Sequence, residues 1–161
     1  MTIGVLFVCT ANLCRSPMAE GVFRSQAMKA GLAGAVEIDS AGTGARDAGQ
    51  PPSRLAIEAA AARGYDISGI RARQVTGDDI RRFDHVLAMT RNHLVELRWL
   101  APRELAGKPQ LLMSYAAAVG TLDIADPFGG TADDYERAIG MIEAATRGLV
   151  ARLTPEIKKA I

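Results

Sequence analysis

The sequence has only two cysteines, Cys9 and Cys14, and both lie in one short segment of the 161 residues. A secreted disulfide scaffold needs more cysteines, spread along the chain. A structural zinc site usually needs four ligands, and the only other soft candidates are His85 and His93. We therefore expect the two thiols to serve local chemistry, with no resident metal or cofactor.

An excess of charge of one sign and a long apolar run are also missing. Lys and Arg total 19 and Asp and Glu total 18, so the net charge of +1 creates no field for nucleic acid or anionic membrane. The first apolar run, residues 3–9, is too short to span a bilayer and does not resemble a signal peptide. We expect no nucleic-acid partner, no membrane insertion and a cytoplasmic location.

What remains is a globular composition, with 48% hydrophobic and 23% charged residues, and a length that fits one domain over residues 1–161. Short β-like runs alternate with helical periods, which predicts an α/β fold with a parallel sheet covered by helices on both faces. Strands are predicted at residues 3–8, 36–40, 85–89 and, more weakly, 108–112. Helices are predicted from Ser16 to a stop at Gly31, at 53–63, after Thr76, at 92–100, and from Thr131 to near Pro155.

The first strand leads into the segment C-T-A-N-L-C-R-S, residues 9–16, and then into the first helix. A tight turn into a helix N-terminus leaves backbone N–H groups unpaired and concentrates partial positive charge, which suits a tetrahedral dianion. The planar guanidinium of Arg15 adds a fork that binds two phosphate oxygens at once. We expect phosphate to bind at Thr10, Ala11, Asn12, Leu13, Cys14, Arg15 and Ser16.

The same field favours an ionised thiol, since cysteines at helix N-termini or beside arginine ionise more readily than free cysteine. Cys9 is therefore predicted to be a nucleophile aimed at phosphorus, with Arg15 six positions later as the clamp. The alternative is an ordinary buried core cysteine, with Arg15 on the surface. A dinucleotide site is disfavoured because the turn lacks G-x-G-x-x-G and the Walker lysine.

At these residues, and over nearly its whole length, the sequence resembles the low-molecular-weight protein-tyrosine phosphatase family. The matching stretches are residues 8–20 (V-C-T-A-N-L-C-R-S-P-M-A-E), 40–43 (S-A-G-T), 71–74 (R-A-R-Q), 87–89 (L-A-M) and 126–130 (D-P-F-G-G). The loop and the Asp-Pro pair together are highly specific to that family and its close relatives.

The resemblance implies a four-stranded parallel sheet with the phosphate-binding loop between the first strand and the first helix. It implies a two-step, metal-free mechanism in which Cys9 becomes a phosphocysteine. Arg15 would clamp the transferring group, while Asp126 would protonate the leaving phenol and then activate water. Asn12, Ser16 and Ser40 would shape the loop. From the residues alone, the Asp126-Pro pair is also compatible with a simple turn.

The sequence departs from the family pattern at several positions. Relatives often carry Gly at Ala11, His at Ile70, an aromatic wall residue at Arg46 and Asp at Thr90. Phe128 keeps an aromatic at the pocket lip, but Gly129 follows it. These changes leave the chemistry intact and affect substrate preference.

Phosphotyrosine on a protein or peptide is the favoured substrate, and a tyrosine kinase is one candidate partner. The apolar Leu13 suits a phenyl ring, with Arg46 and Phe128 completing the substrate rim.

A protein-arginine phosphatase is the main alternative, because that relative shares the D-P-F-G-G stretch but carries Thr at the position of Leu13. An arsenate reductase is disfavoured because no cysteine follows Cys14. A phosphosite-binding module without turnover is also disfavoured, because binding alone needs neither Cys9 nor Asp126.

Cys14 is a candidate redox residue, since it could capture oxidised Cys9 as a reversible disulfide. The alternative is that Cys14 is a small apolar residue that only fills space in the core. Four arginines are candidate rim cations for acidic phosphopeptides: Arg46, Arg54, Arg71 and Arg91. His85 and His93 are expected to have structural or surface roles.

Overall fold

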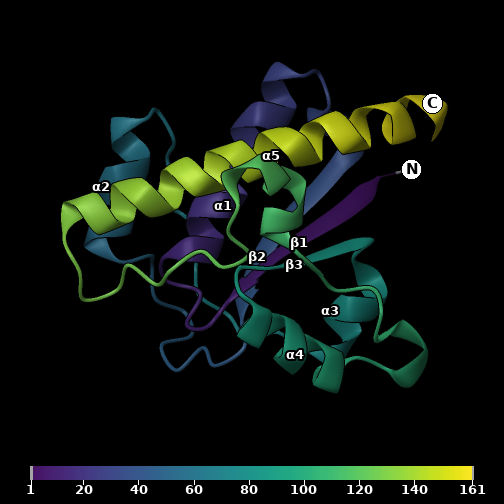
Figure 1. Cartoon of the computed structure of the whole chain (residues 1–161), viewed down its shortest axis with the longest axis horizontal. Helices are drawn as coiled ribbons and strands as arrows, with labels where there is room; N and C mark the ends of the chain where they lie inside the picture. Colours follow the sequence, from purple (N-terminus) through teal and green to yellow (C-terminus); the bar gives the residue numbers. More distant parts are fainter. Residues whose placement is uncertain (1, 161) are drawn as a thin grey trace.

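A four-stranded parallel sheet forms the centre of the computed structural model, which describes residues 2–160. The strands lie in the order β2-β1-β3-β4, so the predicted parallel sheet and its count of strands are confirmed. Figure 1 shows β1 and β3 side by side in the middle of the molecule. The strand bounds are β1 Ile3–Cys9, β2 Val36–Gly42, β3 His85–Ala88 and β4 Gln110–Leu111.

Helices cover both faces of this sheet (Figure 1). The helix α5 runs across one face beside α1 and α2, while α3 and α4 lie on the other. The bounds are α1 Arg15–Lys29, α2 Arg54–Ala62, α3 Gly77–Arg82, α4 Arg91–Leu100 and α5 Ala132–Ala160, with short 3-10 turns at Ala33–Ala35, Arg103–Leu105 and Leu112–Val119.

The alternation of side chains along β1 explains the two layers. Val5 and Phe7 enter the core beneath α1 and α5, while Leu6 and Val8 enter the core beneath α3 and α4. All four side chains are fully buried, as expected of a central strand in a parallel sheet. This burial fixes β1 firmly, and its last residue, Cys9, is held at the edge of the sheet.

Side-chain hydrogen bonds stabilise several helix starts. Thr76 and Asp79 form the capping box of α3, with each side chain bonding to the other's backbone N–H. Ser53 accepts a hydrogen bond from the backbone N–H of Ala56 at the start of α2. Before α5, the carboxylate of Asp134 accepts hydrogen bonds from the backbone and hydroxyl of Thr131.

Several element boundaries differ from the sequence-based expectation. The strand β2 continues to Gly42, because Gly42 pairs with Cys9 across the sheet. The strand β4 contains only Gln110–Leu111, and a 3-10 turn starts at Leu112. The helix α5 continues through Pro155, because Leu153 and Ile157 remain buried in the core on either side of it.

The segments that were expected to form the site meet at the carboxyl ends of the strands. Thr43 and Gly44, after β2, donate backbone hydrogen bonds to the carbonyls of Cys9 and Thr10. Beyond β3, Ile124 donates a backbone hydrogen bond to Met89 and brings the 121–128 segment to the same edge. None of the helices within residues 2–160 is both long enough and apolar enough to cross a membrane.

Candidate active site

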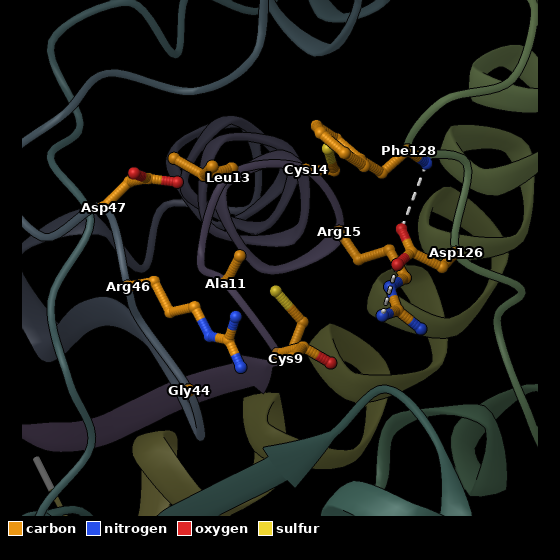
Figure 2. Close-up of a pocket in the computed structure, with 11 residues that line it drawn as sticks. Cys9, Ala11, Leu13, Cys14, Arg15, Gly44, Arg46, Asp47, Asp126 and Phe128 are labelled. Carbon is orange, nitrogen blue, oxygen red and sulfur yellow. Dashed lines mark hydrogen bonds and ion pairs between the residues drawn. The ribbon is translucent and has the colours of Figure 1, made fainter.

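A cavity of about 290 Å³ opens at this edge of the sheet, with Cys9 at its base. Figure 2 shows Arg46 and Asp47 on one side of it, Asp126 on the opposite side, and Leu13 and Phe128 at the rim. The structure therefore brings together the predicted nucleophile, clamp, acid and rim residues. Within residues 2–160, no cluster of three or more His, Cys, Asp or Glu side chains is placed to hold a metal ion.

The loop from Cys9 to Ser16 closes on itself. Cys9 is only 3% exposed, and its Sγ lies 3.0 Å from the Oγ of Ser16. Within the described part of the chain, the backbone N–H groups of residues 10–16 donate to no protein acceptor. These seven donors belong to the loop that joins Cys9 to the first turn of α1, so the loop is suited to an anion with several oxygens.

Asn12 holds the shape of this loop. Its φ of 60° is the only positive value at a non-glycine residue among residues 2–160, so the methyl group of Ala11 is accommodated without strain. The Asn12 Nδ2 donates to Ser16 Oγ at 2.8 Å and to Ser40 Oγ at 3.0 Å, while its Oδ1 accepts from the backbone N–H of Arg73. Because Ser16 accepts from Asn12, its own hydroxyl proton is left for the sulfur of Cys9 at 3.0 Å or for the carbonyl of Ala41 at 3.4 Å.

The network continues to Glu20, a buried residue for which the sequence predicted no role. The Ser40 Oγ donates to Glu20 Oε1 at 2.7 Å, and Arg24 donates to the other carboxylate oxygen at 2.9 Å. Burial raises the pKa of Glu20, and its hydrogen bond with Ser40 opposes that shift. Ile70, where relatives often carry His, is half-buried and packs against the apolar core instead.

Arg15 is 4% exposed and points into the cavity floor beside Asp126 (Figure 2). Its Nη1 donates to the carbonyl of Ile124 at 2.9 Å, and its Nη2 lies 3.6 Å from Asp126 Oδ2. Its Nε is buried and has no acceptor within the described residues. An unpaired buried donor is costly, so this group is suited to a ligand oxygen.

Asp126 reaches the cavity from the loop before α5. Its side chain is 53% exposed, and its Oδ1 accepts a hydrogen bond from the backbone N–H of Phe128 at 3.1 Å. The following Pro127 disfavours a helical backbone at Asp126, and the Asp126 side chain lines the cavity. A carboxyl group that is exposed, yet held opposite the thiol, can exchange a proton with both a ligand and water.

His93 contacts the loop between β1 and α1. The sequence predicted a structural or surface role for His93 but not this contact. Its Nε2 lies 2.7 Å from the hydroxyl oxygen of Thr10, and its Nδ1 lies 3.0 Å from that of Thr90. Burial, and then the nearby charge of Arg15, lower the pKa of His93 to about 4. A neutral imidazole donates through one nitrogen and accepts through the other, so His93 bridges the start of α4 to the loop. The Thr-x-x-His spacing at a helix start was the available sequence signal.

Cys14 is a residue of the loop, and its side chain lies among hydroxyl groups. Its Sγ is 3.3 Å from Ser53 Oγ and 3.4 Å from the hydroxyl of Tyr135, and the residue is 5% exposed. Burial raises the pKa of the Cys14 thiol. The cluster joins the loop to the starts of both α2 and α5.

The predicted rim cations separate into two kinds. Arg54 pairs with Glu58, Arg91 pairs with Asp123, and Arg71 donates to the backbone carbonyls of Ser68 and Ile70. Arg46 is exposed, lines the cavity, and directs its guanidinium inward beside Ala11 and Cys9 (Figure 2). Only Arg46, of these four, is placed to meet a substrate.

Comparisons with known proteins agree with this geometry. A low molecular weight protein-tyrosine-phosphatase of Streptomyces coelicolor is 44% identical to this chain, with 98% of each chain covered. The crystal structure of YfkJ from Bacillus subtilis has a TM-score of 0.91 at 35% identity, with 97% of each chain covered. Vibrio vulnificus Wzb in complex with benzylphosphonate has a TM-score of 0.83 at 27% identity, covering 95% of this chain and 100% of Wzb.

The family model described as low molecular weight phosphotyrosine protein phosphatase matches residues 4–159, which is nearly the whole of the sequence. The fold, the loop after β1 and the relatives thus lead to one assignment, and this chain belongs to the low molecular weight phosphotyrosine protein phosphatase family.

Proposed function

We propose that this chain hydrolyses phosphotyrosine on proteins through a phosphocysteine formed on Cys9. The observation that carries the proposal is the position of the Cys9 sulfur, at the base of a cavity with free N–H groups on one side and Asp126 on the other. The tetrahedral phosphate would accept hydrogen bonds from the N–H groups of residues 10–16 and from the guanidinium of Arg15. Phosphoryl transfer depends mainly on such positioning and charge stabilisation.

In the first step, the thiolate of Cys9 attacks phosphorus in line with the leaving tyrosine oxygen. The S–P bond forms as the P–O bond breaks, and the proton of Asp126 passes to the departing phenolate. The Ser16 hydroxyl, 3.0 Å from the sulfur, stabilises the thiolate before attack. A positioned acid of this kind contributes about 10²–10⁴-fold in rate.

In the second step, the Asp126 carboxylate takes a proton from water while the water oxygen attacks phosphorus. The P–S bond breaks, inorganic phosphate leaves, and the Cys9 thiolate is restored with Asp126 protonated for the next cycle. Arg15 would bind the oxygens of the phosphoryl group in both steps. Its buried Nε is free to do so, because it has no other acceptor within the described residues.

A phosphotyrosine side chain fits the rim of the cavity. Leu13 is half-buried and apolar, and Phe128 is 67% exposed at the opposite lip, so both can contact a phenyl ring. Benzylphosphonate, bound by the Vibrio relative, joins a phenyl ring to a phosphonate, and these resemble the ring and the phosphate of phosphotyrosine. The partner is then a phosphorylated protein, with an autophosphorylated tyrosine kinase of the cytoplasm as one candidate.

A rate comparison of phosphotyrosine and phosphoarginine peptides, with a chelator present, tests the proposal. We expect the chain to cleave the phosphotyrosine peptide faster, and we expect Leu13→Thr to narrow that difference. Cys9→Ser should abolish turnover while still binding vanadate. A faster rate on phosphoarginine would overturn the substrate assignment, and full activity of Cys9→Ser would overturn the mechanism.

A further inference from the structure

Among residues 2–160, Arg46 is the one cationic residue of the pocket that the two-step mechanism does not use and that has no counter-ion. It lies on the loop after β2. Its backbone N–H donates to the carbonyl of Gly44 at 3.0 Å, and this bond holds the backbone from which the side chain extends. Within residues 2–160, no carboxylate oxygen lies within 4.0 Å of its guanidinium. Asp47, the next residue, also lines the cavity and is not paired with it.

The two arginines of the cavity differ in their surroundings. Arg15 is buried, and its guanidinium is held by the Ile124 carbonyl and by Asp126. Arg46 is exposed, lies on the opposite wall, and directs its guanidinium toward the cavity (Figure 2). Arg15 therefore serves the transferring phosphate, while Arg46 remains free for a second anion on the same substrate.

We propose that Arg46 forms a subsite for an acidic side chain next to the phosphotyrosine, so that the preferred substrate is an acidic phosphopeptide. This inference rests on the proposed function and deepens it. A guanidinium binds a carboxylate through two parallel hydrogen bonds, and the cavity rim is open enough for a peptide to bring a glutamate to it. The neighbouring Asp47 repels an acidic group placed further from Arg46, which confines the favoured position.

The test is a ratio of kcat/KM values for two phosphotyrosine peptides, one with glutamates on both sides of the phosphotyrosine and one with glutamines there. The unmodified chain should prefer the glutamate peptide by about two- to fivefold, the range of an exposed ion pair. This preference should fall toward one as the NaCl concentration rises, because salt screens exposed charges.

Substitutions of Arg46 should change the ratio in a graded way. Arg46→Gln should bring the ratio to about one, Arg46→Lys should retain part of the preference, and Arg46→Glu should reverse it. Arg54→Gln removes an exposed arginine that pairs with Glu58 outside the cavity, and it should leave the ratio unchanged. The ratio within each variant is independent of any common effect on turnover.

Two outcomes would overturn the subsite while leaving the proposed function in place. One is normal hydrolysis of phenyl phosphate by the unmodified chain with no preference between the peptides. The other is a preference that persists in Arg46→Gln. A chain that fails to hydrolyse phenyl phosphate at all would overturn the proposed function, and the subsite with it.

Discussion

The sulfur of Cys9 and the hydroxyl oxygen of Ser16 lie 3.0 Å apart, at the two ends of the loop that encloses the proposed phosphate site. The same hydroxyl accepts from Asn12 Nδ2 at 2.8 Å, so its proton remains for the sulfur, which is closer than its other acceptor, the Ala41 carbonyl at 3.4 Å. One side chain thus links the shape of the loop to the state of the nucleophile.

Replacing Ser16 with Ala should weaken this link. A hydrogen bond to a charged group contributes about 1.5–3 kcal/mol, so turnover should fall by roughly 10- to 100-fold. Alkylation of Cys9 by iodoacetate at pH 6 should slow as well, which a stopped assay with mass spectrometry can follow. Ser114→Ala, on the 3-10 turn after β4, provides a control that should change neither rate. Unchanged alkylation in Ser16→Ala would show that the hydroxyl does not stabilise the thiolate.

Asp126→Asn should slow the reaction according to the leaving group. Phenyl phosphate needs a proton on its leaving oxygen, so its kcat should fall by about 10²–10⁴-fold. An ester with a very acidic leaving phenol should be slowed far less in its first step, and a burst of the released phenol would report it. If Asp126→Asn slowed the first step equally for both substrates, Asp126 would not be the acid.

His93 should make folding stability depend on pH in a defined window. Burial and the charge of Arg15 lower its pKa from 6.5 to about 4, so the unfolded chain binds the proton more readily. Stability from the neutral imidazole is then present above pH 6.5 and is lost as the pH falls toward 4, by up to about 3 kcal/mol.

Urea unfolding of the wild-type chain and of His93→Gln across that window measures this contribution. The difference in unfolding free energy between the two should shrink steadily from pH 7 to pH 4. The same subtraction with Ser114→Ala, an exposed position that does not titrate, should stay flat. A flat difference for His93→Gln would contradict the buried neutral imidazole.

Cys14 should protect Cys9 from irreversible oxidation. Peroxide would convert the Cys9 thiolate to a sulfenic acid, and the Cys14 sulfur would then displace water to form a disulfide. Because burial raises the pKa of Cys14, this capture should be slow at neutral pH and faster at higher pH. Cys14→Ser should recover less activity with thiol after peroxide treatment. Recovery as complete as that of the wild type would leave Cys14 a packing residue.

Gly42 should be required for activity because it packs directly against the loop, with no room for a side chain. A Cβ there would lie 2.3 Å from the carbonyl oxygen of Thr10 and 3.0 Å from the backbone nitrogen of Asn12. Gly42→Ala should therefore displace the loop, lower the unfolding free energy by about 1–3 kcal/mol and reduce phosphate binding. Gly34→Ala, where a Cβ meets nothing within 4 Å, should preserve both. Normal vanadate affinity in Gly42→Ala would show that the loop tolerates the shift.

The sequence was most informative where structure and chemistry are local. The buried run of β1, the turn and the start of α1 follow one another, so Cys9 and Arg15 were predicted on one loop from their spacing. Asp126 has no such local signal, and only the family resemblance separated it from a turn residue. The structure then brought it within 3.6 Å of Arg15.

The residues that sequence reasoning missed act through contacts between distant segments. His93 meets Thr10 across 83 positions, and Tyr135 meets Cys14 across 121. Neither contact leaves a periodic pattern, because each depends on how α4 and α5 pack around the sheet. Among the four candidate rim arginines, the separation of Arg46 from the others likewise needed their partners to be visible.

The hydrogen bond from Arg15 to the carbonyl of Ile124 has a consequence for synthesis on the ribosome. The nucleophile and its clamp emerge early, but the group that orients the clamp is added only after more than a hundred further residues. A nascent chain that ends before Ile124 would carry a complete phosphate loop with a guanidinium that nothing holds in place. Catalytic competence should thus appear late in translation, once the segment preceding α5 has left the exit tunnel.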